Sequence, residues 1–195
     1  MKKSILALTL IASTISGAAL ARDGFYVGAA YSNVGYGSVD LDGSSLKDQK
    51  EENGYSVFVG YDFPIGSTFV LGTEFEYKDL GGVSGSMEID GDVYKTELNI
   101  KSIGLNVMPK VYFGEKFNLF AKAGLHKFTT DATASFNTGS TVISASLSED
   151  EFSMVWGLGL GYDLTQNIAL NTTYEVVGTD SGNIASANIG LKYKF

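Results

Sequence analysis

The sequence predicts an all-β protein, specifically an eight-stranded antiparallel up-and-down transmembrane β-barrel. Three observations support this fold class: features of an export signal at the N-terminus, eight stretches in which apolar residues recur at every second position, and connections that alternate between short and long. The composition agrees, because 24 glycines, 12 phenylalanines and 11 tyrosines among 195 residues are typical of many short strands with two different faces.

Composition also excludes several classes of protein. The chain carries 22 acidic and 14 basic residues, a net charge of −8, whereas a nucleic-acid-binding protein needs clustered positive charge. We therefore expect no nucleic-acid partner. The lack of cysteine excludes disulfides, thiolate metal sites and thiol chemistry. The length suits a single domain.

The first predicted element is a signal peptide at residues 1–21. Lys2 and Lys3 precede an apolar run at residues 5–15, and small residues follow up to Ala21. The run is about half the length of a membrane-spanning helix, so we expect a cleaved secretory signal rather than an anchor. Cleavage after Ala21 leaves residues 22–195 as one β-barrel domain, in which no stretch approaches the ~18 apolar residues of a spanning helix.

The first predicted strand spans residues 25–32. Phe25, Val27, Ala29 and Tyr31 share one face, and the intervening residues share the other. Apolar residues at i, i+2 and i+4 indicate a strand whose two faces differ. The same spacing predicts seven further strands, at residues 54–63, 68–78, 94–113, 117–126, 152–164, 168–176 and 185–195.

The fourth of these strands is irregular. Its second half alternates regularly from Ile103 and Leu105 onward, but Leu98 and Ile100 are out of phase with that half. We expect either a bulge near residues 101–102 or a change from a membrane segment to a surface extension.

The connections between the predicted strands alternate in length. They are long at residues 36–53, 80–92 and 131–150, short at 64–67, 114–116 and 165–167, and of modest length at 179–183. Short turns therefore gather at one end of the barrel and long loops at the other. Outer-membrane barrels have this plan, with short periplasmic turns and long external loops.

We expect the apolar face to meet lipid. It is aromatic towards the strand ends and aliphatic between them, as in Tyr55, Val57, Val59 and Tyr61, and aromatic side chains prefer the membrane interfaces. The opposite face is chiefly Gly, Ala, Ser, Asn and Thr, which suits the narrow interior of an eight-stranded barrel. The alternative is a soluble barrel of the lipocalin type, with the apolar face inside around a ligand.

The chain ends in a spaced pattern of one polar residue, one glycine and two aromatic residues: Asn188, Gly190, Tyr193 and Phe195. With the signal and the strand pattern, this ending resembles the Gram-negative outer-membrane β-barrel family, the small eight-stranded OmpA/OmpX-like and opacity-like proteins. The resemblance implies a place in the cell outer membrane, among outer-membrane lipid and lipopolysaccharide. It also implies that these four residues form an assembly signal read by the barrel-assembly machinery. Alternatively, Phe195 merely completes an aromatic girdle.

Six charged residues near the middle of the strands are assigned to the polar face, which lines the lumen. They are Glu74, Glu76, Lys101, Lys122, Glu175 and Lys192. Isolated charges are costly in a low-dielectric lumen, so we expect pairing across strands. Two interpretations follow: a satisfied network that fills the barrel, or, as proposed for OmpA-like barrels, a gate whose exchange of partners opens a narrow porin-like path for ions or small solutes. A wide porin is excluded, because it needs about 16 strands.

His126 is the only histidine and offers little basis for catalysis or metal binding. The outer-membrane lipid A deacylases resemble this chain in size and strand number, but their pattern has a serine two positions after the histidine, where this chain has Phe128. We interpret His126 as a structural or rim residue and predict no catalytic residue, metal or cofactor. The expected function is that of a non-catalytic outer-membrane protein with a structural or surface-interaction role, whose external loops contact a host or another surface ligand.

Overall fold

The computed structural model shows eight strands and describes residues 24–36, 52–89, 92–137, 142–179 and 182–195. The predicted signal peptide at residues 1–21 lies outside these ranges. No helix in the described ranges is long and apolar enough to cross a membrane. The strands are β1 (Gly24–Tyr36), β2 (Glu52–Pro64), β3 (Phe69–Ile89), β4 (Asp92–Phe113), β5 (Phe117–Asn137), β6 (Val142–Asp163), β7 (Ile168–Thr179) and β8 (Gly182–Lys194).

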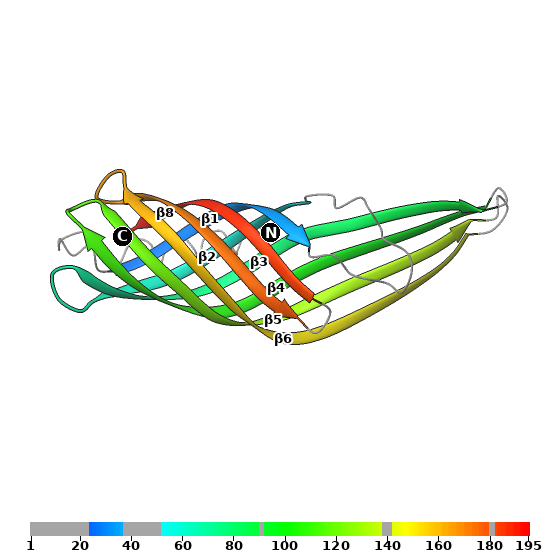
Figure 1. Ribbon diagram of the computed structural model, residues 1–195, viewed down its shortest axis with the longest axis horizontal. Helices are drawn as coiled ribbons and strands as arrows, with labels where there is room; N and C mark the ends of the chain where they lie inside the picture. The colour runs from blue at the N-terminus through cyan, green and yellow to red at the C-terminus, as the bar shows by residue number, and fades with distance from the viewer. Residues whose placement is uncertain (1–23, 37–51, 90–91, 138–141, 180–181) are drawn as a thin grey trace, which may run out of the picture.

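The strands form a closed antiparallel barrel in which each strand pairs with its neighbours in sequence (Figure 1). β1 pairs with β8 from Tyr26 opposite Lys194 onward, and the amide of Phe195 donates to the carbonyl of Phe25 at 3.0 Å. This closure removes the sheet edges within the barrel, as a membrane-spanning sheet requires. The predicted fold class is therefore confirmed.

The outer face of the barrel is apolar and the inner face is buried. Leu105 on β4 and Leu158 on β6 are 65% and 66% exposed, and they alternate with buried residues along each strand. Aromatic rings gather near the short turns, where Phe113 and Phe117 lie 6.1 Å apart across one hairpin. This distribution confirms that the apolar face points outward, because a polar solvent would disfavour so wide an apolar band.

The predicted long connections at residues 80–92 and 131–150 are wrong for most of their length. β3 and β4 continue to Ile89 and from Asp92, and β5 and β6 continue to Asn137 and from Val142. These four strands project well beyond the other four (Figure 1). We call residues 82–89, 92–100, 129–137 and 142–151 the external sheet. Their small polar residues resemble a loop in composition, but pairing between neighbouring strands satisfies the backbone hydrogen bonds inside the sheet.

The irregularity predicted in the fourth strand is not caused by a bulge at residues 101–102. β4 pairs with β5 in one register throughout, and the register shift lies on β3, between Asp79 and Gly82. Gly81 takes a φ of 78° within this bulge, a value that favours glycine. The second interpretation is thus the right one: β4 leaves the membrane barrel as a surface extension.

Candidate functional site: a filled lumen and an external sheet

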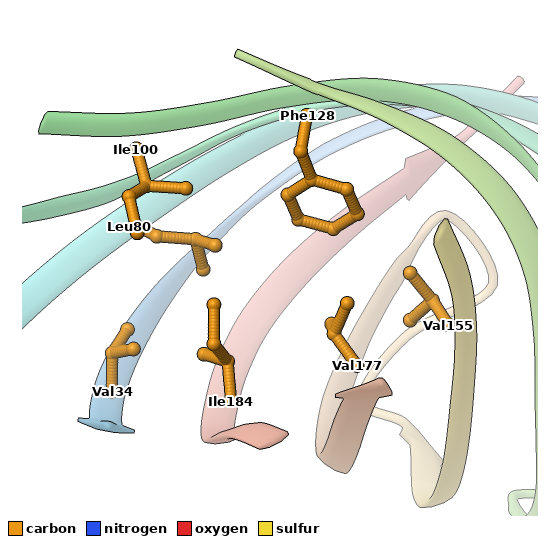
Figure 2. Close-up of a cluster of buried hydrophobic side chains, with 7 residues drawn as sticks. All are labelled: Val34, Leu80, Ile100, Phe128, Val155, Val177 and Ile184. Carbon is orange, nitrogen blue, oxygen red and sulfur yellow. The ribbon is translucent and has the colours of Figure 1, made fainter. Parts of the chain in front are cut away.

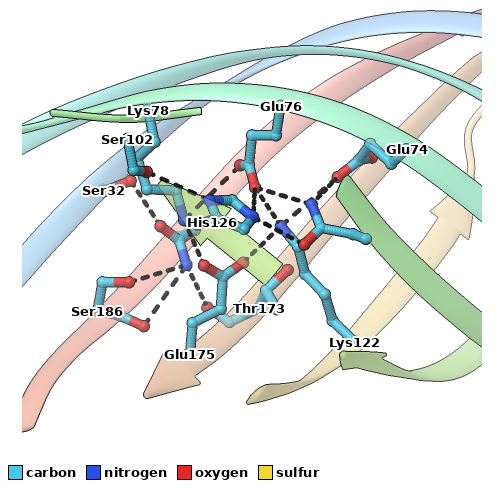
Figure 3. A network of polar contacts seen from close by, with 12 residues as sticks. Ser32, Glu74, Glu76, Lys78, Ser102, Lys122, His126, Thr173, Glu175 and Ser186 are labelled. Atoms are coloured by element: carbon cyan, nitrogen blue, oxygen red, sulfur yellow. Dashed lines mark hydrogen bonds and ion pairs between the residues drawn. The ribbon is translucent and has the colours of Figure 1, made fainter. Parts of the chain in front are cut away.

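A group of five ionisable side chains lies in the sheet-side half of the lumen (Figure 3). Lys122 of β5 is its centre, with Nζ 2.6 Å from Glu76, 3.0 Å from Glu175 and 3.5 Å from Glu74. Lys78 of β3 pairs with Glu175 and lies 3.6 Å from Glu76. Alternation along β3 brings Glu74, Glu76 and Lys78 to the same inner face.

The pair register explains why Lys122 meets Glu175. Lys122 lies opposite Gly157, and Gly157 lies opposite Glu175, so the three share one row of the sheet. A Cβ atom on Gly157 would lie 2.9 Å from Cγ of Glu175. The glycine therefore leaves room for two long side chains to meet over it.

His126 is a buried part of the same network. Its Nε2 lies 2.9 Å from Oδ1 of Asn106 and its Nδ1 lies 3.3 Å from the hydroxyl of Ser102. A Cβ atom on Gly104 would lie 2.3 Å from the imidazole, so only glycine fits there. With 1% of its surface exposed, His126 is structural and does not lie at the rim.

A second ionic group lies nearer the end of the barrel that holds the short turns. Lys110 of β4 contacts Asp62 of β2 at 2.6 Å, and Lys192 of β8 lies 3.7 Å from the same carboxylate. Lys194 of β8 contacts Asp163 of β6 at 2.7 Å. These pairs fix four strands against one another across the lumen.

Tyr26 of β1 links the two groups. Its hydroxyl lies 3.2 Å from Oε2 of Glu74, while the Lys192 ammonium lies 4.1 Å from its ring centroid. A cation over an aromatic ring is stabilised by the negative face of the ring. Both the aromatic ring of Tyr26 and the carboxylate of Asp62 thus offset the cost of burying the Lys192 charge.

The lumen charges balance. Among the described residues, the buried acidic side chains are Asp62, Glu74, Glu76, Asp163 and Glu175, and the buried lysines are Lys78, Lys110, Lys122, Lys192 and Lys194. Each of these ten lies within 4 Å of a group of opposite charge. Buried charges are tolerated when they are paired in this way. A cavity of only about 40 Å³ remains between the two groups, enough for a few water molecules.

An apolar layer covers the network on the side of the external sheet (Figure 2). Seven strands supply one buried side chain each: Val34, Leu80, Ile100, Phe128, Val155, Val177 and Ile184. The eighth strand, β2, passes this level with Gly54, where a Cβ atom would lie 2.5 Å from the carbonyl oxygen of Asp79. An apolar constriction disfavours water and ions, so this layer closes the lumen above the charges.

The structure brings together five of the six predicted lumen residues. Glu74, Glu76, Lys122 and Glu175 lie in the first group and Lys192 in the second. The assignment of Lys101 to the lumen is wrong: Lys101 is exposed on the outer face of β4, opposite Asp79. Because β4 contains no bulge, Lys101 keeps the outward direction of the apolar residues that follow it.

Five further lumen charges are not among the six predicted network residues. They are Asp62, Lys78, Lys110, Asp163 and Lys194. Each lies two residues along its strand from another residue that points inward. Because side chains alternate between the two faces, this spacing is the signal that identifies them.

The four C-terminal residues of the predicted assembly signal divide between the two faces. Asn188 is buried in the lumen and donates to the carbonyl of Thr173 at 3.2 Å. Tyr193 is exposed on the outer face, and its ring lies 5.1 Å from that of Phe195. Gly190 lies against Ala30 of β1. Recognition of these residues by the assembly machinery stays a prediction.

Within the described residues, two edges of the external sheet have no pairing strand. β2 pairs with β3 only as far as Asp79, and β7 pairs with β6 only from Val155. Residues 144–150 of the β6 edge are all exposed. Near the base of the sheet, Asp150 accepts hydrogen bonds from Lys127 at 2.8 Å and Thr129 at 2.7 Å, and these bonds lower the pKa of its carboxyl group.

A closed eight-stranded barrel with an apolar outer face and a polar, charge-paired lumen is thus established. The model for the outer membrane protein beta-barrel domain matches residues 4–195. The chain belongs to this family. Membership places this β-barrel protein in the outer membrane, with the short turns on the periplasmic side and the external sheet outside the cell.

Individual relatives are more distant. The virulence membrane protein PagC of Salmonella typhimurium is 25% identical over 195 residues, covering 100% of both chains. The crystal structure of Ail, the attachment invasion locus protein of Yersinia pestis, in complex with the heparin analogue sucrose octasulfate has a TM-score of 0.59 at 17% identity, covering 89% of this chain and 99% of that one. Neisserial surface protein A has a TM-score of 0.50 at 16% identity, covering 88% and 97%. These structures share the fold.

Proposed function

We propose that this outer-membrane β-barrel is a non-catalytic surface protein that binds another molecule through its external sheet. The observation that carries the proposal is a sheet, held outside the barrel by four strands, with two edges that pair with no other described strand. Unpaired backbone groups on an exposed edge are a template for contact with another chain. The expectation of external contact is kept, but the contact surface is a sheet rather than long loops.

The relatives support a role at the cell surface. PagC is a virulence membrane protein, and Ail is an attachment invasion locus protein whose structure includes a heparin analogue. At these identities the likeness establishes the fold, and the role is carried over to this chain as part of the proposal.

The lumen supports the non-catalytic part of the proposal. Ser102 and His126 are in contact, but both are buried, and neither lines the small cavity between the ionic groups. A nucleophile and its base need access to a substrate. The alternative of a narrow channel is disfavoured by the apolar layer, which remains closed whichever charges are paired.

Three finer predictions complete the proposed function: export by the signal peptide at residues 1–21, contact with outer-membrane lipid and lipopolysaccharide, and insertion by the barrel-assembly machinery. Deletion of Phe195 tests the last of these. We expect the variant to accumulate in the periplasm, with the amount in the outer-membrane fraction falling several-fold. Normal insertion would contradict the proposed signal.

The binding role is tested by shortening the external sheet. Residues 83–98 and 132–147 are each replaced by a two-residue turn, which removes paired segments and leaves the barrel rows intact. We expect a Gram-negative host expressing the full chain to adhere several-fold better to cultured epithelial cells than the same host expressing the shortened chain. Both proteins should shift in mobility on boiling in dodecyl sulfate, which shows that each barrel is closed. Equal adherence would overturn the proposal.

A further inference from the structure

The excess negative charge of the chain is concentrated in the two sequence segments that contain the external sheet. Residues 82–100 and 129–151 contain eight acidic residues and one lysine, a net charge of −7, against −8 for the whole chain. The lumen, by contrast, holds equal numbers of buried acids and lysines. The external field of the protein is therefore negative, so it attracts cations and repels polyanions over about a Debye length of 8 Å at physiological salt.

The β6 edge is the better of the two edges for strand addition. β6 pairs with β5 in one register from Phe117 opposite Tyr162 to Asn137 opposite Val142, whereas β3 is interrupted by the bulge at residues 80–81. The edge at residues 142–154 contains no proline and no lysine, the residues that usually protect an edge from pairing. Its charges are the carboxylates of residues 149–151, so this regular edge of the described sheet disfavours an acidic strand and accepts a basic one.

The direction of the backbone groups on this edge follows from hydrogen bonds lower in β6. The amide of Asp163 donates to Lys116 on the β5 side, and the amide of Leu164 donates to Ile168 on the β7 side. Backbone groups alternate in direction along an antiparallel strand. Even-numbered residues, Ser144, Ser146, Ser148 and Asp150 among them, therefore present their N–H and C=O groups to the open edge.

Side chains on the edge define the chemistry of a partner. Leu147 is 77% exposed, and Glu149 follows it on the same face. Asp150 lies on the opposite face. Leu147 lies opposite Ala132 of β5, which lies opposite Leu98 of β4. One face thus offers a short apolar row beside a carboxylate, and both faces carry negative charge.

We propose that the β6 edge at residues 144–151 binds an extended, lysine- or arginine-rich segment of another protein as an added strand. Main-chain groups of the segment pair with those of the even-numbered residues. Its cationic side chains lie on the face that carries Glu149 and Glu151, and its apolar side chains lie on the opposite face. This inference rests on the proposed binding role of the external sheet and specifies the partner. It also separates this chain from Ail, whose structure was solved with a sulfated heparin analogue.

The first experiment measures binding to the full chain in bilayer nanodiscs. The probes are a nine-residue peptide of alternating lysine and valine, its counterpart of glutamate and valine, and heparin, each labelled for fluorescence anisotropy. We expect saturable binding of the lysine peptide and at least about tenfold weaker binding of the two anionic probes. Equal or tighter binding of either anionic probe would overturn the proposal.

Two variants locate the site. Ser146→Pro removes an amide that faces the open edge and keeps the pairing with β5, since proline is tolerated at such positions; we expect about tenfold weaker binding of the lysine peptide. The double variant Glu149→Gln, Glu151→Gln should weaken binding about three- to tenfold. Glu97→Gln, which removes a charge from β4 away from this edge, is the matched control and should change affinity less than twofold. Boiling in dodecyl sulfate verifies that each barrel is closed.

The adherence assay distinguishes failure of the β6 assignment from failure of the binding role of the external sheet. In one outcome, shortening the sheet abolishes adherence, but Ser146→Pro and the glutamine double variant change neither adherence nor peptide binding. The assignment of the contact to the β6 edge is then wrong, and the binding role of the sheet stands. If the shortened sheet adheres like the full chain, the binding role itself is wrong.

Discussion

Strands β3 to β6 contribute both to the lumen and to the external sheet, but the two regions treat charge in opposite ways. Inside the barrel, each carboxylate lies beside a lysine and the groups are nearly inaccessible to solvent. Outside, the segments at residues 82–100 and 129–151 carry eight acidic residues and one lysine. The difference shows that a strand's environment decides the role of its charges: pairing is obligatory where water is excluded and optional where water solvates them.

The largest effect that we expect comes from removing the central lumen lysine. Lys122→Met leaves Glu74, Glu76 and Glu175 without their shared cation, so the free energy of unfolding should fall by about 3–5 kcal/mol. Urea titration of the folded protein in lipid vesicles, followed by Trp156 fluorescence, measures this change.

Lys101 provides the matched control for that experiment. It is a lysine on the outer face of the neighbouring strand β4, so Lys101→Met should change the free energy of unfolding by less than about 1 kcal/mol. Equal losses in the two variants would contradict the separation between a paired lumen and a tolerant exterior.

The apolar layer gives the next largest effect. Phe128→Ala opens a cavity among Leu80, Ile100 and Val155 and should lower the free energy of unfolding by about 3 kcal/mol. In planar bilayers we expect no lasting openings from Glu175→Gln alone, because the layer still excludes ions. Openings should require Glu175→Gln together with Phe128→Ser. Reproducible openings in Glu175→Gln alone would favour the charge-gated channel instead.

The barrel is predictable from sequence because its physics is local. Alternation with a period of two, turn residues at positions such as Pro64, and aromatic residues at strand ends each depend on a few neighbouring residues. The lumen partners are not local: Lys122 meets Glu175 because two successive strand registers bring them into one row across Gly157. Sequence can place each of them on the inner face but does not set the registers between strands.

The external sheet was missed for a different reason. Its strands contain runs such as residues 144–148, where serine alternates with alanine and leucine. Small side chains make the alternation faint, and serine and glycine favour turns as readily as strands. The misplacement of Lys101 has a different cause: Leu98 and Ile100 are out of phase with the second half of the strand, which suggests a bulge, whereas β4 continues without interruption.

The smallest expected effect concerns Asp150 at the base of the external sheet. Its pKa is lowered by hydrogen bonds from Lys127 and then from Thr129. The carboxyl group is therefore ionised more readily in the folded protein than in the unfolded chain. A lowered pKa contributes stability at pH values above the pKa of the unfolded chain, near 4, and this contribution is lost as the pH falls through the pKa of the folded protein.

The urea midpoint of Asp150→Asn should therefore lie slightly below that of the parent at pH 7, and the two midpoints should converge below about pH 3. Because the group is exposed to solvent, added salt should reduce the difference at pH 7. A difference that persists at low pH or in high salt would mean that Asp150 acts through packing, and that charge outside the barrel is as constrained as charge inside it.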